Sequence, residues 1–268
     1  MLKLNLVLLG LGGNTKYIGY MGSIYTKLIL GGMGITAGSV VLARSMQPQL
    51  VFMPPKHYHE VHHRFGDISY TMKVRDTRKI IIYSHGNGED ICTIDYDGLS
   101  QELGYTVVTY DYPGYGLSAG IPDESGCIES LSIITNHIMK QYPNSDIIQV
   151  GRSLGTGVLV QYAYRTKWKS PIVLLSPFKS IGRVLCDSCI TDDLSGMFRT
   201  CDVIDKLICP VKIIHGTRDK LVPCDHGQYL YSKLQYPLEP VYKNCGHNDL
   251  PLLRKDIIDI LSCRLVSP

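Results

Sequence analysis

The chain has 268 residues, and its hydrophobic and charged fractions of 44% and 19% exclude an intrinsically disordered protein. A formal net charge of +3, with no continuous stripe of Lys and Arg, argues against nucleic-acid binding. The nine cysteines, an odd number scattered from Cys92 to Cys263, do not suggest a disulfide framework and favour a reducing, cytosol-facing environment.

Residues 1–45 form a hydrophobic N-terminal segment, which we separate from a globular domain over residues 46–268. Residues 28–43 carry no charge and lie between Lys27 and Arg44. This run is shorter than the ~20 residues that cross a bilayer, although it becomes long enough if extended upstream with Lys27 snorkelling to the interface. We therefore expect a membrane anchor. The alternative is a cytoplasmic protein in which this segment packs on the globular domain.

Beyond Pro48, short β-rich runs alternate with helical stretches. The predicted strands are Ile68–Val74, Lys79–Ser84, Thr106–Tyr110, Ile147–Val150, Pro171–Leu175, Val211–Ile214 and a short run near Val241. The predicted helices are Asp95–Leu103, Glu124–Gln141, Leu154–Arg165, His226–Leu234 and Asp249–Leu261. This alternation favours an α/β protein with a mostly parallel sheet of about eight strands and helices on both faces. Residues 177–210 are too few to hold a large lid domain.

Residues 151–155 read G-R-S-L-G and directly follow the predicted strand Ile147–Val150. A buried strand that ends in G-x-S-x-G and turns at once into a helix is typical of a nucleophile elbow. The two glycines leave room for a tight turn, and the helix N-terminus directs backbone N–H groups to the same place. We therefore expect Ser153 to be a nucleophile exposed at the sheet edge.

Two candidate partners for this serine follow later strands. A serine hydroxyl needs a base to take its proton, and the base needs a carboxylate to orient it. Asp219 comes just after the strand Val211–Ile214, and His247 precedes the last predicted helix. A lone loop Asp or His is more often a turn or capping residue, but the order Ser, Asp, His is that of the α/β-hydrolase arrangement. Asp249 is the alternative carboxylate, although the first turn of a helix commonly holds an acidic residue.

Acyl transfer also needs N–H donors aimed at the oxyanion that develops on the carbonyl. The backbone N–H of Leu154, at the start of the helix after the nucleophile, is one candidate. Asn87 is the second, because it lies in the sequence H-G-N-G at residues 85–88, after a predicted strand. The alternative is that these glycines only form a turn. This chemistry requires no cofactor and no metal.

A competing signal lies at residues 59–63, which read H-E-V-H-H and satisfy the zinc-protease motif H-E-x-x-H. That motif requires a helix that presents His59 and His63 one turn apart. A proline pair precedes it and no third ligand segment follows, so we expect a surface histidine cluster. Cys186 and Cys189 have no second C-x-x-C pair and are interpreted as ordinary thiols.

Several longer segments resemble the alpha/beta hydrolase domain-containing protein 17 group, over approximately residues 48–262. The wider set that includes the Bem46-like serine hydrolases is similar too. The segments that carry the resemblance are LVFMPP at 50–55, SHGNG at 84–88, YDYPGYG at 110–116, GRSLGT at 151–156, HGTRD at 215–219, HG at 226–227 and GHND at 246–249.

The resemblance implies an α/β-hydrolase fold and a membrane-associated thioesterase that removes palmitate from cysteines of peripheral membrane proteins. Two departures stand out. The group carries a palmitoylated N-terminal cysteine cluster, whereas here no cysteine precedes Cys92, so residues 1–45 would serve as the anchor instead. The second is Arg152, which stands where we expect Gln in the group.

The expected function is therefore serine hydrolysis of acyl esters or thioesters, with an acylated protein or a lipid as the substrate and a membrane as the expected location. One alternative is a lipid or small-molecule carboxylesterase or acylglycerol lipase. A second alternative, from another class, is a non-catalytic binding module or membrane adaptor built on the same fold.

Overall fold

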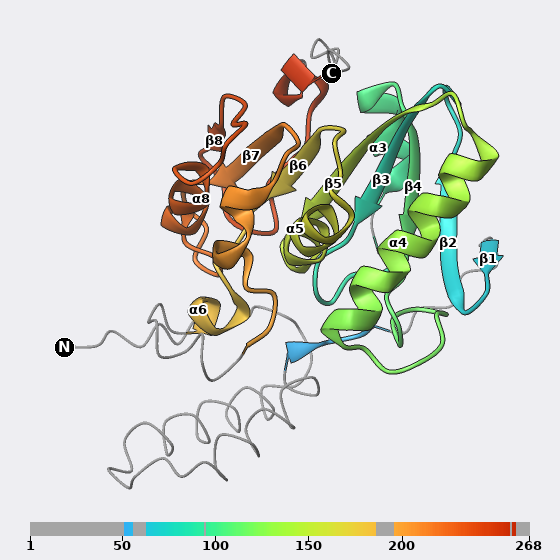
Figure 1. The fold of residues 1–268 in the computed structure, drawn as a ribbon, viewed down its shortest axis with the longest axis horizontal. Coiled ribbons are helices and arrows are strands. Elements are labelled where there is room, and N and C mark those ends of the chain that lie inside the picture. The colour runs from blue at the N-terminus through green and yellow to red at the C-terminus, as the bar shows by residue number, and fades with distance from the viewer. Residues whose placement is uncertain (1–50, 56–62, 94, 186–195, 258, 261–268) are drawn as a thin grey trace, which may run out of the picture.

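The computed structural model describes residues 51–55, 63–93, 95–185, 196–257 and 259–260, and the remaining residues are drawn as a grey trace in Figure 1. The predicted anchor in residues 1–45 lies outside the described residues. No helix in the described part is long and apolar enough to cross a membrane.

An eight-stranded sheet forms the centre of the molecule, with the strand order β1-β2-β4-β3-β5-β6-β7-β8. The strand β2 pairs antiparallel with β1 and β4, and every other pair is parallel. The bounds are β1 His63–Phe65, β2 Ile68–Lys73, β3 Lys79–Ser84, β4 Thr106–Tyr110, β5 Asp146–Arg152, β6 Ile172–Leu175, β7 Val211–Gly216 and β8 Val241–Lys243. The mostly parallel sheet predicted from the sequence is confirmed.

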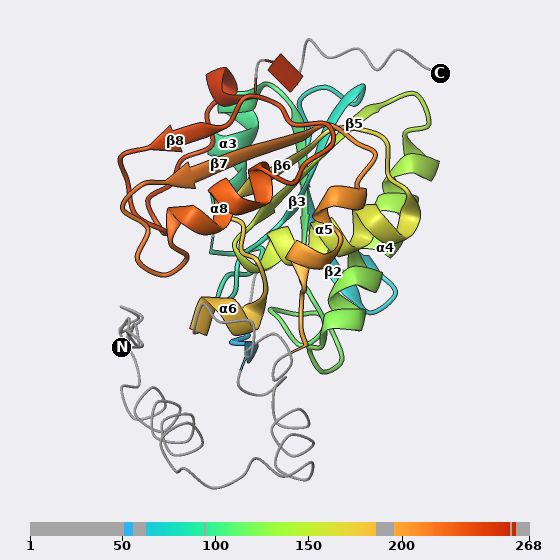
Figure 2. The same ribbon diagram turned by 60° about the vertical axis from the view of Figure 1, so that its left-hand side comes forward.

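Helices cover both faces of the sheet (Figures 1 and 2). On one face lie α4 (Glu124–Gln141), α5 (Leu154–Thr166) and α8 (Cys224–Tyr231), and on the other lie α3 (Tyr96–Leu103) and the C-terminal segment. The strand β3 shows why two hydrophobic cores result. Its residues Ile80 and Ile82 pack into the first core, whereas Ile81 and Tyr83 pack into the second, because successive strand residues point to opposite faces.

Short polar residues determine where the two amphipathic helices begin. The Asp123 carboxylate accepts the Gly126 N–H at 2.6 Å and caps α4, and Asp95 caps α3 through the Gly98 N–H at 2.8 Å. At its other end α3 stops at Gly104, whose φ of 69° is left-handed. The segment between β6 and β7 contains α6 (Ile181–Leu185) and two short 3-10 turns, η1 (Thr200–Asp202) and η2 (Ile204–Lys206).

The predicted closing helix Asp249–Leu261 is wrong over residues 249–257. Residues 250–253 have no regular secondary structure and a 3-10 turn, η3 (Arg254–Asp256), follows, while the described residues 259–260 are helical. The cause is Pro251, which disfavours the helical conformation of the preceding residue. Leu250 and Leu252 are both buried, while Pro251 between them is exposed, so the segment packs with the alternation of a strand. Sequence reasoning also missed the short strand β1 and helix α6.

Candidate active site

Ser153 lies in the turn between β5 and α5 with a positive backbone φ of 49°. A side chain is strained in this conformation, and the turn is held by a hydrogen bond of 2.9 Å from the Ser153 N–H to the Leu175 carbonyl oxygen. A Cβ atom on Gly151 would stand 2.5 Å from the Gly155 carbonyl oxygen, so residue 151 has room only for glycine. The strand-to-helix turn that the motif predicts is present at the carboxyl edge of the sheet.

His247 lies between the other two predicted site residues. Its Nε2 atom is 2.9 Å from Ser153 Oγ, and its Nδ1 atom is 2.7 Å from Asp219 Oδ2. The parallel strands β7 and β8 end side by side, which places the loops carrying Asp219 and His247 together. Because an ionised carboxylate can only accept, Nδ1 carries the proton, and Nε2 then accepts the hydroxyl proton of Ser153.

The Asp219 carboxylate is fixed by several donors. Its Oδ1 atom accepts the N–H groups of Leu221 and Val222 at 3.0 and 2.8 Å, and its side chain is fully buried. Burial alone would raise the pKa of Asp219, but the nearby ring of His215, at 3.6 Å, and the hydrogen bond from His247 outweigh it and hold that pKa well below its ordinary value. This carboxylate is therefore ionised at neutral pH and can stabilise a positive charge on His247.

The two predicted oxyanion donors, Asn87 and Leu154, belong to segments that lie beside Ser153. The loop after β3 passes beside Ser153, because a Cβ atom on Gly86 would stand 3.6 Å from Ser153 Cβ. Within the described part of the chain, the backbone N–H groups of Asn87 and Leu154 donate to no acceptor. The Asn87 side chain is already used, since its Oδ1 accepts the Met53 N–H at 2.9 Å. Only the backbone N–H of Asn87 is thus available to a ligand.

Three buried tyrosines hold this loop, and the sequence analysis did not assign them a role. One hydroxyl reaches the last residue of β3, and the other two reach the loop that follows it. The three contacts are Tyr110 Oη to Ser84 Oγ at 2.8 Å, Tyr112 Oη to the His85 carbonyl oxygen at 2.7 Å, and Tyr115 Oη to Asn87 Oδ1 at 2.6 Å. The spacing Y-D-Y-P-G-Y at residues 110–115 was the available signal, but the partner loop is evident only once β3 and β4 are paired.

A buried His–Asp pair lies behind the same loop. His85 Nδ1 is 2.9 Å from the Gly86 carbonyl oxygen, so Nδ1 carries a proton. His85 Nε2 and Asp111 Oδ1 lie 3.7 Å apart, and both side chains are fully buried. Burial lowers the pKa of His85 and raises the pKa of Asp111 to about 7. Both shifts favour the neutral forms of the pair.

Other residues singled out by the sequence lie elsewhere. Asp249, the alternative carboxylate, is in a turn rather than a helix, and its Oδ2 accepts the Gly246 N–H at 3.3 Å. It therefore supports the loop that carries His247. From the zinc motif, His63 begins the strand β1, whereas His59 lies outside the described residues. The described residues contain no cluster of three or more potential metal ligands.

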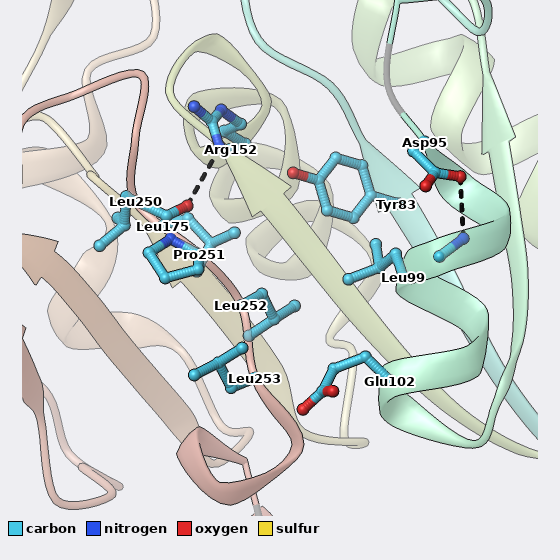
Figure 3. A pocket seen from close by; sticks show the side chains of 11 residues that line it. Tyr83, Asp95, Leu99, Glu102, Arg152, Leu175, Leu250, Pro251, Leu252 and Leu253 are labelled. Atoms are coloured by element: carbon cyan, nitrogen blue, oxygen red, sulfur yellow. Dashed lines mark hydrogen bonds between the residues drawn. The ribbon is translucent and has the colours of Figure 1, made fainter.

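A groove of 410 Å³ lies between α3 and residues 250–253 (Figure 3). Its walls include Leu99 and Leu252, and Arg152 lies at one end beside Tyr83. None of Ser153, Asp219 and His247 lines this groove, so it is separate from the candidate active site.

Comparisons with known proteins agree with this architecture. The family described as serine aminopeptidase, S33, matches residues 75–189. A putative alpha/beta hydrolase of Acanthamoeba polyphaga mimivirus is 42% identical over 180 residues, which cover 65% of this chain and 68% of the relative. Human alpha/beta hydrolase domain-containing protein 17B is 32% identical over 177 residues, covering 64% of this chain. The match spans only 61% of the length of that human relative.

Among solved structures, Est1E from Butyrivibrio proteoclasticus, with ferulic acid bound, has a TM-score of 0.62 at 16% identity. The alignment covers 75% of this chain and 99% of that one, so the likeness extends to the whole fold. The sheet, the strand-to-helix turn at the serine and these relatives all indicate the same fold family. The expected resemblance to the alpha/beta hydrolase domain-containing protein 17 group is confirmed, and the chain belongs to the α/β-hydrolase family of serine hydrolases.

Proposed function

We propose that this serine hydrolase cleaves acyl esters or thioesters through Ser153, His247 and Asp219. Its proposed substrates are acylated proteins, and palmitoylated proteins in particular. The observation that carries the proposal is the continuous line of contacts at 2.9 and 2.7 Å that joins the hydroxyl, the imidazole and the buried carboxylate.

In this mechanism His247 Nε2 takes the hydroxyl proton as Ser153 Oγ attacks the carbonyl carbon. The carbonyl π electrons move to oxygen, and the N–H groups of Asn87 and Leu154 stabilise the resulting oxyanion. When the tetrahedral intermediate collapses, His247 gives its proton to the departing alkoxide or thiolate. Water then attacks the acyl-enzyme with His247 again as base, which releases the carboxylic acid and regenerates the serine.

The assignment of a protein-borne thioester rests on the resemblance to the alpha/beta hydrolase domain-containing protein 17 group, seen at 32% identity to human 17B. A thiolate is a good leaving group, so the mechanism needs no feature beyond those above.

The test compares purified wild type with Ser153→Ala on p-nitrophenyl acyl esters of increasing chain length and on S-palmitoylated peptides. We expect the substitution to abolish both activities, and the wild type to cleave long-chain thioesters. Equal rates in both proteins would exclude the serine mechanism. Cleavage of esters alone, with palmitoylated peptides left intact, would exclude the thioester assignment and leave the carboxylesterase alternative.

Membrane association through residues 1–45 is also part of the proposal, supported by the uncharged run at residues 28–43. Charged substitutions in that run, Ile35→Lys with Val40→Lys, should move the full-length protein from the membrane fraction to the soluble fraction because each charge is costly in hydrocarbon. An unchanged distribution would exclude this segment as the anchor.

A further inference from the structure

Arg152, the residue directly before the nucleophile, reaches across to the loop that carries His247. Its guanidinium donates to the carbonyl oxygens of His247 at 3.1 Å, Asn248 at 3.0 Å and Leu250 at 3.3 Å. Figure 3 shows the last of these contacts. A planar guanidinium has five N–H donors and can satisfy several acceptors at once, which a lysine cannot do in the same geometry. One side chain thus fixes the path of this loop over three residues.

The same guanidinium pairs with the loop on the other side of the nucleophile. Arg152 Nε is 3.3 Å from Glu89 Oε1, and Glu89 Oε2 accepts the Gly86 N–H at 2.6 Å. The side chains of Arg152 and Glu89 are only 14% and 23% exposed, so the pair is screened far less than a surface ion pair. Gly86 directly precedes Asn87, whose N–H is the proposed oxyanion donor. Glu89 therefore holds the backbone that presents this donor.

Together these contacts connect two loops that are distant in sequence. The chain of contacts begins in the loop after β3 that carries Gly86 and Asn87, here called the oxyanion loop. It continues through Glu89 and Arg152 to the loop that carries His247. Both loops must be in place in the transition state, because one presents the oxyanion donor and the other the general base. A displacement of about 1 Å in such a group can reduce a rate about 10²-fold.

We propose that Arg152 and Glu89 are positioning residues, which fix the oxyanion loop and the His247 loop in place relative to each other. The proposal rests on the serine mechanism above. Neither side chain touches the reacting atoms; each acts through the backbone of a neighbouring loop. The pair should therefore affect kcat much more than KM, because the oxyanion donor and the general base act mainly in the transition state.

The experiment measures kcat and KM for p-nitrophenyl butyrate with five variants of the full chain. These are Arg152→Met, Arg152→Lys, Glu89→Gln, the double variant Arg152→Met/Glu89→Gln, and Ser153→Ala. We expect Arg152→Met to lower kcat about 10- to 100-fold with KM within about threefold of wild type. Arg152→Lys should fall in between, because it keeps the ion pair but loses the carbonyl contacts. The double variant should be no slower than Arg152→Met, since both changes break one connection.

The matched control is Arg75→Gln, which breaks the exposed Arg75–Asp97 pair at 3.5 Å and should leave kcat unchanged. Thermal melts show which variants fold. If Arg152→Met does not fold, Glu89→Gln decides, because it removes the charge pair and leaves the carbonyl contacts of Arg152 intact.

The outcomes separate the two proposals. If Ser153→Ala is inactive while the folded Arg152 and Glu89 variants keep kcat within twofold of wild type, the positioning role is wrong and the serine mechanism stands. Strictly additive losses in the double variant would also overturn the positioning role. If Ser153→Ala keeps wild-type activity, both proposals fall.

Discussion

Gly155 lies against Ser84 so closely that a Cβ atom built on Gly155 would stand 2.1 Å from the Ser84 carbonyl oxygen. This contact brings the first turn of α5 against the end of β3. The second glycine of the G-x-S-x-G motif is therefore needed for packing between two elements as well as for the turn at the nucleophile.

We expect Gly155→Ala to destabilise the protein by about 3 kcal/mol or more, because the clash is with backbone and no rotamer change relieves it. Urea denaturation of both proteins checks the value. The control is Gly66→Ala, where φ is 60° but no atom lies within 4 Å of the added Cβ. Only the left-handed backbone opposes that change, at about 1–2 kcal/mol. Equal losses in the two variants would contradict the close packing at Gly155.

Asp219→Asn should reduce kcat by about 10²–10⁴-fold with little change in KM. The amide lacks the charge that stabilises protonated His247. Its NH₂ group can also donate to Nδ1, which favours the tautomer in which Nε2 carries the proton and cannot act as a base. The matched control is Asp249→Asn, because among the described residues that carboxylate accepts the Gly246 N–H alone, and an amide oxygen can do the same. Steady-state kinetics on one acyl ester decides between the two carboxylates. A larger loss in Asp249→Asn would reverse the assignment.

Tyr115→Phe should lower both stability and kcat. The hydroxyl donates to Asn87 Oδ1 at 2.6 Å, and its removal costs about 1 kcal/mol, or about a fivefold effect on a rate that depends on this loop. Melting temperature and kcat are measured together. The control is Tyr236→Phe, because that side chain is 52% exposed and should leave both unchanged. A stable Tyr115→Phe with full activity would show that the tyrosine does not hold the loop.

Much of the fold could be predicted because local and long-range signals agree. The strands Lys79–Ser84 and Thr106–Tyr110 and the helix Glu124–Gln141 have the bounds expected from the sequence. Each strand is a short apolar run between turn residues, and the helix repeats its apolar residues every three or four positions. The segment after Asp249 has apolar residues too, but Pro251 prevents their use as a helix face.

The sequence alone suggests the three candidate site residues, whereas it does not reveal the residues that hold their loops in place. The proposed nucleophile, base and orienting carboxylate each belong to a local motif that follows a strand. The contacts of Arg152 with the His247 loop join residues 95 or more positions apart, such as His247 at a sequence separation of 95. The tyrosine hydroxyls likewise meet a loop that only the β3–β4 pairing brings near. Such contacts depend on topology, which no local pattern specifies.

The buried carboxyl of Asp111 should make the stability of the protein decrease as pH rises from about 4 to about 7. Burial, followed by the nearby charge of Asp90, raises its pKa to about 7, whereas in the unfolded chain it is about 3.9. Between these values the folded state binds more protons than the unfolded state, so stability falls with pH. The loss is up to about 4 kcal/mol and is complete above about pH 7.

Asp111→Asn removes this titration while its amide oxygen can still accept the Ile91 N–H, which the carboxylate accepts at 2.9 Å. Urea denaturation at pH 5, 6, 7 and 8 gives the free energy of unfolding of both proteins. The wild type should lose stability relative to the variant between pH 5 and pH 7, with little further change between pH 7 and pH 8. The test uses the difference in free energy of unfolding between the two proteins, because other groups titrate in both. A difference that is constant with pH would mean that Asp111 is already ionised at pH 5, and that His85 or a polar group nearby stabilises its charge in the folded protein.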